Sequence, residues 1–362
     1  MICLYYGPIT SKGQLSIGGY EAANRKNIDK LRSLGIQVKE YPNPVINKKL
    51  GCFGKIVYIK LLSSAMNLLK YKKRSDVVVH ITPLYNYLLF PSVFTIWLAK
   101  LCRLPSVLDL RAGSFIYYYE HKGYWYKKLV KSILNNSTII TVEGTPYLKQ
   151  IPMLTGIDKE MVYFPNIACN IKLKYAPRKG NTVNIFYFGR ITSTKGLDVV
   201  IDAIKELDEK FVLYLAGKIA GDINADELKH ERIIYLGILS AEQLKEQMQN
   251  MHFFIFPTRH RGEGQSNSLI EAMANGLIPI VSEQGFNREV VGDCGVIMPH
   301  TSKGKDYANV IRELSKKDIV EMAKKCQQHI HSCHNIDIEI PKLVELYNSC
   351  LLYTSDAADD SL

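Results

Sequence analysis

The sequence lacks the marks of several protein classes. It has no tract rich in proline, glycine and serine, which excludes a long disordered linker of that composition. Its eight cysteines include no Cys-x-x-Cys pair and no dense cluster, so a small secreted disulfide framework is excluded and a reducing cytosol is expected. The opening residues, MICLYYGPITSKG, carry no basic region before their short apolar run, which predicts a first strand rather than a signal peptide.

Positive charge is concentrated in the first half of the chain. Residues 1–175 contain 25 Lys and Arg against 9 Asp and Glu, whereas the rest contain 21 against 26. Nucleic acids and anionic membranes both attract such charge. The basic runs KYKKR (70–74) and YKKLVK (126–131) stand among apolar and aromatic residues, as in segments at a membrane interface. We therefore expect an anionic membrane as partner and no nucleic acid; a single-strand binder or a solvated basic surface are the alternatives.

Short apolar runs alternate with amphipathic segments along the whole chain of 362 residues. The runs include ICLYYG, DVVVHI and SVLDLR in the first half and VNIFYFG, FVLYLAG, FFIFPT and IPIVSE in the second. This alternation predicts an α/β protein with parallel sheets covered on both faces. We expect two Rossmann-like parallel-sheet domains facing across a cleft, at 1–168 and 169–352. Residues 353–362 are predicted to be a disordered or non-native tail.

Two segments invite other interpretations. Residues 81–99 contain no charged side chain and have about the length that spans a bilayer, but Pro91 and several polar residues favour a buried core helix. The second segment holds Cys326, His329, His331, Cys333 and His334. Thiolates and imidazoles bind zinc, yet the segment lacks a Cys-x-x-Cys pair, so incidental clustering is favoured over a metal site.

Two loops carry residues suited to binding anions. In the first, FGRITSTKG (188–196) follows a predicted strand, and its two cations, five residues apart, can reach one diphosphate. In the second, FPTRHRGEGQSNSLIEAMANGLIPIV (256–281), a helix is expected to begin near Ser266. Helix N-termini bind phosphates, because free N–H groups point at the anion. Glu263 and Glu271 are eight residues apart, too far for a pair of glycosidase carboxylates.

The order of these motifs resembles the donor domain of glycosyltransferase family 4, which has the GT-B fold. The resemblance covers Gly-Arg, Lys-Gly and Glu-x7-Glu throughout residues 183–299. A looser resemblance to the acceptor domain of that family is carried by the early Gly-Gly and by DVVVHITP and SVLDLRAG. It implies a retaining glycosyltransferase of the hexosyltransferase type, without an enzyme nucleophile. Such an enzyme moves a sugar from a nucleotide-sugar to a glycan or polyprenyl-diphosphate-linked saccharide in cell-surface polysaccharide biosynthesis.

The resemblance also implies roles by position. Arg190 and Lys195 would hold the donor diphosphate, Glu263 the transferred sugar, and Glu271 the ribose hydroxyls. Further donor contacts are implied for Gly189, Gly264, Gln265, Ser266, Asn267 and Ser268 and, from the other domain, for Gly18 and Gly19. No cofactor or metal is expected, because two cations and a helix N-terminus would neutralise the diphosphate.

The acceptor side departs from the family pattern. Relatives often carry a histidine where this sequence has Arg111, and arginine cannot serve as a base at neutral pH. His80 is a possible substitute, so both residues are candidates for the acceptor side. The expected location is cytoplasmic, at the inner face of the cell membrane. A sugar-nucleotide epimerase, a phosphorylase of the same fold and a non-catalytic sugar-nucleotide or nucleic-acid binding protein are the alternative functions.

Overall fold

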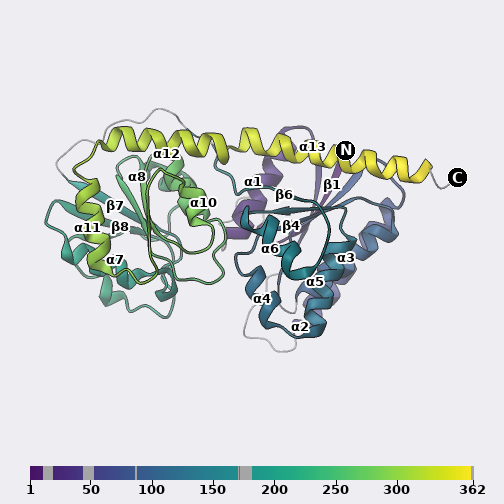
Figure 1. Ribbon diagram of the computed structural model, residues 1–362, viewed down its shortest axis with the longest axis horizontal. Helices are drawn as coiled ribbons and strands as arrows, with labels where there is room; N and C mark the ends of the chain where they lie inside the picture. The colour runs from purple at the N-terminus through teal and green to yellow at the C-terminus, as the bar shows by residue number, and fades with distance from the viewer. Residues whose placement is uncertain (11–18, 44–52, 86–87, 170, 172–181, 360–362) are drawn as a thin grey trace. The chain divides into compact units, whose positions relative to one another are not determined.

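The computed structural model describes residues 1–10, 19–43, 53–85, 88–169, 171 and 182–359 (Figure 1). Its contacts divide the chain into unit 1, residues 1–165 together with 336–362, and unit 2, residues 166–335. Each unit contains one six-stranded sheet in which every neighbouring pair of strands is parallel. Two parallel α/β sheets confirm the fold class predicted from the alternation of apolar and amphipathic segments.

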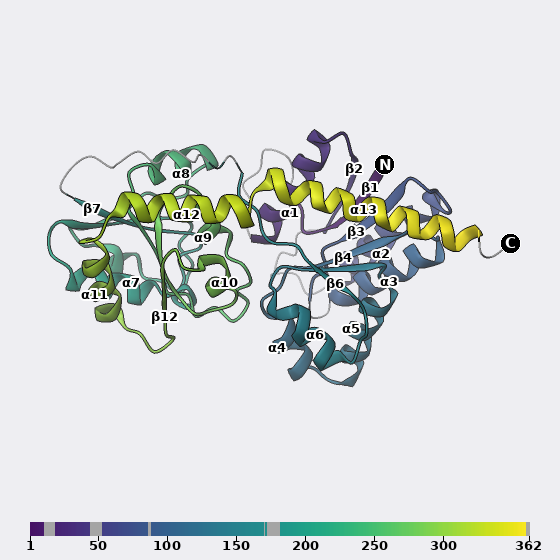
Figure 2. The ribbon, with the colours of Figure 1, turned by 45° about the horizontal axis from the view of Figure 1, so that its top comes forward.

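The sheet of unit 1 has the strand order β2-β1-β3-β4-β5-β6. Its strands are β1 (Ile2–Gly7), β2 (Gln37–Pro42), β3 (Val77–Ile81), β4 (Ser106–Leu110), β5 (Ile139–Val142) and β6 (Met161–Tyr163). Its helices are α1 (Gly19–Ser33), α2 (Phe53–Ala65), α3 (Leu89–Leu101), α4 (Phe115–His121), α5 (Tyr124–Asn136), α6 (Pro146–Thr155) and α13 (Ile336–Asp359), with the 3₁₀ turn η1 (Met66–Tyr71). Helix α1 packs against α13, and α3 packs against both α2 and α5 (Figure 2).

The sheet of unit 2 has the strand order β12-β11-β10-β7-β8-β9. Its strands are β7 (Val183–Phe188), β8 (Phe211–Ala216), β9 (Ile233–Tyr235), β10 (Phe253–Phe256), β11 (Ile278–Ser282) and β12 (Val296–Met298). Its helices are α7 (Leu197–Glu206), α8 (Ala241–Met248), α9 (Asn267–Ala274), α10 (Asn287–Val291), α11 (Gly304–Leu314) and α12 (Ile319–Cys333), with the 3₁₀ turns η3 (Ser193–Lys195) and η4 (Ala225–Leu228). Ser240 and Gln243 form a capping box at the start of α8.

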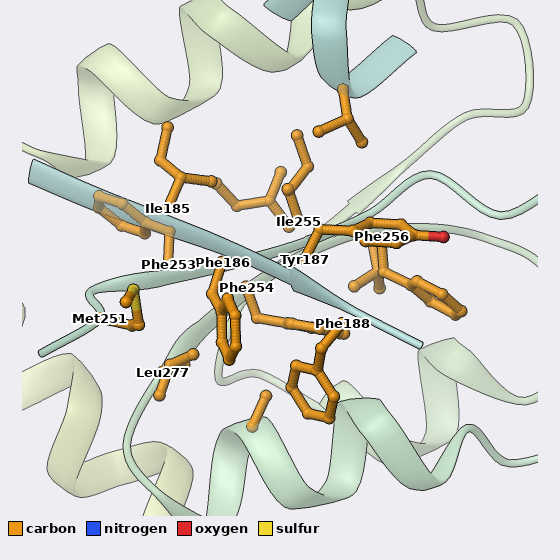
Figure 3. Packing of buried hydrophobic residues seen from close by; sticks show 14 of the residues in the cluster. Ile185, Phe186, Tyr187, Phe188, Met251, Phe253, Phe254, Ile255, Phe256 and Leu277 are labelled. Atoms are coloured by element: carbon orange, nitrogen blue, oxygen red, sulfur yellow. The ribbon is translucent and has the colours of Figure 1, made fainter. Parts of the chain in front are cut away.

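The two central strands of unit 2 are lined with aromatic side chains. Phe186 and Phe188 on β7 lie with their ring centres 5.1 Å apart, and Phe188 lies 5.2 Å from Phe254 on β10. All three rings are buried, and alternate residues of β7 point to opposite faces of the sheet (Figure 3). Close-packed rings on both faces make β7 and β10 a rigid base for the loops at their carboxyl ends.

The division into units differs from the predicted domains at two places. The first segment of unit 1 ends at Pro165, three residues before the expected boundary at 168. Residues 336–352, which were expected in the second domain, belong to unit 1 because α13 packs on α1 and β3. Helix α13 also continues to Asp359, into the segment predicted to be a disordered tail from 353.

The charge-free segment 81–99 forms the end of β3 and most of α3, a helix of 13 residues. Within the described residues, no helix is long and apolar enough to cross a bilayer. Val93, Ile96 and Ala99 are buried, as predicted for a core helix. The opposite side of α3 is exposed and apolar, which the prediction of a core helix did not include.

Candidate functional site

In the sheet of unit 2, the order in which the chain adds strands reverses between β7 and β10. From β7 the chain adds β8 and β9 on one side, whereas β11 and β12 are added beyond β10 on the other side. In open parallel sheets, ligands bind at such a switch point, beyond the carboxyl ends of the strands. The loops 189–196, after β7, and 257–266, after β10, therefore define the candidate donor site.

Lys195 and Glu263, from these two loops, form an ion pair. The Lys195 ammonium contacts the Glu263 carboxylate, and the two side chains are only 13% and 10% exposed. Thr258 donates a hydrogen bond to the same carboxylate at 3.2 Å, and Lys195 Nζ lies 5.1 Å from the centre of the Phe256 ring. An ammonium group has three donors, so Lys195 can hold Glu263 and still bind a phosphate. The sequence predicted both residues as site residues, and the structure brings them together.

The two loops are held against each other by main-chain contacts. Gly196 has φ +77°, and a Cβ at this position would lie 2.1 Å from the Pro257 carbonyl oxygen, so only glycine fits. The Arg259 amide donates to the Thr194 carbonyl at 2.8 Å, and the Arg259 guanidinium donates to the Ser193 carbonyl at 3.2 Å. This packing fixes the position of Lys195 relative to Glu263.

Arg190 is exposed beside this ion pair. Tyr187, at the end of β7, donates its hydroxyl to the Arg190 carbonyl at 3.0 Å, which fixes the backbone while the guanidinium is left at the surface. The preceding Gly189 has φ +136°, a backbone conformation that favours glycine. A Cβ at this position would meet nothing within 4 Å, so the conformation requires glycine here and lack of space does not. Arg190 and Lys195 thus project from one short loop, as expected for a diphosphate site.

His260 belongs to the same group of side chains, although the sequence analysis did not select it. Burial lowers its pKa, and the charges of Lys195 and Arg190 lower it further against the opposing effect of Glu263. His260 is therefore neutral at neutral pH and can donate or accept one hydrogen bond at each ring nitrogen. The only sequence signal for it is its place in the FPTRHRGEG loop.

Helix α9 begins at the end of the second loop. The Ser266 hydroxyl accepts a hydrogen bond from the Leu269 amide at 3.5 Å and lies 2.9 Å from the Ser268 hydroxyl. Asn267 and Ser268 form the first turn of α9, and Glu271 follows one turn later with a half-buried side chain. The N-terminus of α9 thus lies beyond β10, where the sequence predicted phosphate binding.

The side chain of Gln265 has a positioning role. Its Oε1 accepts from the Asn166 amide at 2.8 Å, and its Nε2 donates to Glu289 at 3.1 Å. The adjacent Gly264 offers its carbonyl to the Phe286 amide at 3.3 Å. The Gln265 carbonyl also accepts a hydrogen bond from Asn166 Nδ2 at 2.8 Å, so these groups brace the loop.

Of the two glycines predicted to contact the donor from unit 1, the structure describes Gly19. Gly19 is the first residue of α1 and is exposed. Gly18 lies outside the described residues. The structure therefore carries no geometric argument for Gly18.

His80 and Arg111 are buried in unit 1 and share one carboxylate. Arg111 Nε donates to Asp109 at 2.5 Å, and His80 Nε2 lies 3.4 Å from the same carboxylate oxygen. The Tyr347 hydroxyl lies 2.7 Å from His80 Nδ1. Burial lowers the pKa of His80, whereas Arg111 and His80 hold the pKa of Asp109 down against the effect of burial. This geometry favours an internal role for His80, whose side chain is fully buried, over contact with an acceptor.

A second polar cluster lies near Arg111 and was missed by the sequence analysis. Glu143, directly after β5, is buried, and its charge acts on the hydroxyls of Tyr20, Tyr85 and Tyr147. Burial is the main cause that raises the pKa of Tyr20 and of Tyr85. The Tyr147 hydroxyl donates to the Ala112 carbonyl at 2.7 Å, whereas those of Tyr20 and Tyr85 have no hydrogen-bond partner among the described residues. The two phenol hydroxyls and the Glu143 carboxylate thus belong to one buried polar cluster.

A small pocket lies at the switch point of the unit 1 sheet, between the carboxyl ends of β1 and β3. It is lined by Tyr6, Gly7, Asn43, Leu61, Ile81, Thr82, Leu84, Leu88, Pro91, Ser92 and Thr95. Five of the lining side chains are apolar and five carry a hydroxyl or an amide, so the pocket has a mixed lining.

The cysteines and histidines near the end of α12 make separate contacts. His329 Nε2 lies 3.0 Å from the Val290 carbonyl, His334 Nδ1 lies 2.8 Å from the Asn166 carbonyl, and the Cys326 thiol lies 3.1 Å from the Cys294 carbonyl. No three potential ligands converge on one point within the part of the chain that the structure describes. The cluster seen in the sequence is thus divided among different neighbours.

Comparison with known proteins agrees with the geometry of unit 2. Residues 182–317 match the family model described as "Glycosyl transferases group 1". Over 123 residues the chain is 32% identical to the GDP-mannose:cellobiosyl-diphosphopolyprenol alpha-mannosyltransferase of Xanthomonas oryzae pv. oryzae, a match that covers 30% of this chain and 32% of that protein. The matches span about a third to about half of the length of the curated relatives.

Solved structures share the fold over nearly the whole chain. HepE of Anabaena, in complex with UDP, superposes with a TM-score of 0.71 at 15% identity, covering 96% of this chain and 100% of that one. Sucrose-phosphate synthase of Thermosynechococcus elongatus gives a TM-score of 0.73 at 14% identity, with 98% and 100% covered. At such low identity these likenesses establish the fold alone, which is the GT-B fold.

Proposed function

We infer from the match of residues 182–317 to the family model of group 1 glycosyl transferases that the chain transfers a sugar from a nucleotide-sugar donor to a glycan or lipid-linked saccharide. The observation that carries the proposal is the Lys195–Glu263 ion pair at the switch point of the unit 2 sheet. A cation and a carboxylate held side by side suit the two parts of a nucleotide-sugar, its diphosphate and its sugar hydroxyls.

In this proposal each residue has one task. Lys195 and Arg190 bind the diphosphate, together with the N-terminus of α9, and take the place of a metal ion. Glu263 accepts hydrogen bonds from the transferred sugar, and Glu271 accepts them from the ribose. Charge that develops on the leaving diphosphate is stabilised by groups already in position, which is the usual source of large rate enhancements.

The transfer is proposed to retain the anomeric configuration. The Glu263 carboxylate is engaged by Lys195 and Thr258, which fits a binding group better than a free nucleophile. The leaving diphosphate would then assist the acceptor hydroxyl, as the family resemblance implies. An anomeric assignment of the product by NMR tests this step.

The acceptor is proposed to bind to unit 1 and to be anchored to a membrane. The hydroxyls of Tyr20 and Tyr85 and the carboxylate of Glu143 supply hydrogen-bonding groups for a saccharide. The name of the Xanthomonas relative specifies a diphosphopolyprenol acceptor, which supports a lipid-linked saccharide as the acceptor class. We place the reaction in cell-surface polysaccharide biosynthesis, at the cytoplasmic face of the membrane.

A thermal-shift screen tests the donor class. The purified chain is heated with UDP-, GDP- and ADP-sugars, because the relatives' names include both UDP and GDP-mannose. NAD and single-stranded oligonucleotides serve as controls. One sugar nucleotide is expected to raise the melting temperature, since a ligand that binds only the folded state stabilises it. Stabilisation by NAD or by oligonucleotide alone would contradict the proposal, and donor conversion without any acceptor would point to an epimerase.

A further inference from the structure

Helix α3 carries an exposed apolar stripe. Phe90, Trp97 and Leu101 are spaced seven and four residues apart, which places them on one side of a helix, and their residues are 46%, 63% and 71% exposed. A stripe of this kind on a helix that already buries its other side is unusual for a surface in contact only with water, because large apolar patches mark interaction sites.

The neighbouring helix α5 extends this surface. Tyr124 and Trp125, at its first turn, are 71% and 73% exposed. The Lys128 ammonium lies 5.5 Å from the centre of the Trp125 ring. Helices α3 and α5 pack together, and Lys100 Nζ donates to Asn136 Oδ1 at 3.0 Å across their ends (Figure 2). We call the exposed side of these two helices the α3–α5 surface; it is formed by Phe90, Trp97, Leu101, Tyr124, Trp125, Lys128 and Lys131.

The α3–α5 surface holds both tryptophans of the chain. Tryptophan is rarely left in water, because burying its large ring removes much apolar area from solvent. In membrane proteins the same side chain is enriched at the depth of the lipid headgroups, where its ring is apolar and its N–H can still bond to water. Two such side chains on adjacent helices therefore indicate an interfacial environment.

The stretch of chain that contains α3 and α5 is strongly basic. Residues 53–136 contain 13 Lys and Arg against 3 Asp and Glu. Of the three acidic residues, Asp76 is paired with Arg74 and Asp109 is buried with Arg111, which leaves Glu120 on α4. On α5, Lys128 and Lys131 are both exposed, and the Lys128 ammonium lies beside the Trp125 ring. Such a field attracts an anionic bilayer, and long lysine side chains can keep their charges at the headgroups while their neighbours insert.

We propose that the α3–α5 surface docks on an anionic lipid bilayer, with Trp97, Leu101 and Trp125 inserted at the boundary between headgroups and acyl chains. A protein partner fits less well, because the centres of protein interfaces are poor in lysine. A nucleic acid fits less well, because Leu101 offers it neither a ring for stacking nor a polar contact. The proposal does not depend on the donor site, which lies in unit 2.

The two tryptophans make the test direct, because Trp97→Phe and Trp125→Phe each leave one reporter. Each variant is mixed with phosphatidylcholine vesicles, with and without phosphatidylglycerol, and its emission is recorded. With phosphatidylglycerol, both variants are expected to shift their emission to the blue and to be quenched by brominated acyl chains. Added salt is expected to weaken both effects, since it screens the attraction. An unchanged spectrum with anionic vesicles in either variant would overturn the proposal.

A matched pair of variants separates charge from folding. Lys128→Ala with Lys131→Ala removes two exposed charges from the α3–α5 surface, and Lys324→Ala with Lys325→Ala removes two exposed charges from α12 in unit 2. At about 1 kcal/mol for each lysine near an anionic surface, the first pair is expected to weaken vesicle binding by roughly tenfold to thirtyfold. The second pair is expected to leave it unchanged.

Three outcomes would overturn the proposal. The first is equal loss of vesicle binding in both pairs of variants. The second is self-association of the chain through Trp97 and Trp125 without lipid, and the third is binding of oligonucleotide in place of vesicles. Stabilisation by a sugar nucleotide is measured on the same samples. Because that readout reports unit 2, the failure of vesicle binding can be told apart from the failure of the proposed transferase function.

Discussion

At the scale of single residues, the donor site depends on side chains that hold each other before any ligand arrives. Lys195 and Glu263 are both largely buried, and an ion that is removed from water is costly unless it is paired. The pairing holds both groups in position, and it leaves donors of Lys195 for a phosphate. Their partnership is visible only in the fold, because 68 residues separate them in the sequence.

The tasks proposed for Glu263 and Glu271 can be told apart by comparing the affinities for a nucleoside diphosphate and for a sugar nucleotide. Glu263→Gln is expected to leave the affinity for the free nucleoside diphosphate within about threefold, since that ligand has no sugar to contact. The same change should weaken the sugar nucleotide about tenfold, because a charge-assisted hydrogen bond contributes ~1.5–3 kcal/mol. Glu271→Gln is the control, and it should weaken both ligands alike. Calorimetric titration gives all four affinities, and equal losses in the two variants would refute the assignment.

Removing the hydroxyl of Tyr20 or of Tyr85 is expected to stabilise the fold and to weaken acceptor binding. A buried hydroxyl without a hydrogen-bond partner costs free energy, so Tyr20→Phe or Tyr85→Phe should raise the free energy of unfolding by about 1 kcal/mol. If these groups bind the acceptor, the same changes should raise the KM for a lipid-linked acceptor preparation without changing the KM for the donor. Urea unfolding and steady-state kinetics measure the two effects. A less stable protein with an unchanged acceptor KM would mean that the hydroxyls are structural.

At the scale of elements, the strands and helices followed from the sequence more closely than the contacts between them. Runs such as FFIF and IPIV are apolar throughout because strands β10 and β11 are covered on both faces, and this pattern is readable without a structure. Helix α3 was harder, because an uncharged segment predicts burial but does not show which side of the helix remains exposed. Gly196 belonged to the Lys-Gly motif in the sequence, yet its contact with Pro257 depends on the packing of two distant loops.

The junction after α12 gives unit 2 a dependence on pH. His334 is buried with its Nδ1 2.8 Å from the Asn166 carbonyl, and burial lowers its pKa to about 4. Unfolding restores an ordinary pKa near 6.5, so the unfolded chain binds an extra proton between these values. The contribution of neutral His334 to the free energy of unfolding is complete above about pH 6.5 and is lost as the pH falls toward 4. This contribution amounts to about 3 kcal/mol in full. Urea midpoints between pH 4.5 and 7 should therefore rise with pH, and less so in His334→Gln.

At the scale of the whole molecule, the chain returns to its first unit after completing the second. Tyr347 of α13 is fully buried, and its hydroxyl reaches His80 of β3, while Lys30 of α1 pairs with Asp337 at 2.5 Å. The sequence could not reveal this return, because an amphipathic helix shows that it covers a core but not which core it covers. For the same reason residues 336–352 were predicted to belong to the second domain, whereas they belong to unit 1.

Replacing one buried tyrosine in each unit tests whether α13 belongs to unit 1. Tyr347→Ala should lower the free energy of unfolding of unit 1 by about 3 to 5 kcal/mol, the usual cost of removing a large buried ring. Trp97 and Trp125 both lie in unit 1, so fluorescence-monitored urea unfolding reports that unit. Tyr307→Ala removes a ring of unit 2 that is just as buried, and it should leave the fluorescence transition in place. If only Tyr307→Ala moved the fluorescence transition, α13 would belong with unit 2.

The central claim is that Lys195 of unit 2 binds the diphosphate of a nucleotide-sugar. Calorimetric titration of UDP and of GDP into the wild-type chain, Lys195→Ala and the surface control Lys210→Ala tests it most directly. One nucleotide should bind the wild type and Lys210→Ala equally, and Lys195→Ala should bind it about ten- to a hundredfold more weakly, as expected for a lost charge-assisted hydrogen bond. Binding of neither nucleotide, or equal binding by all three proteins, would contradict the claim.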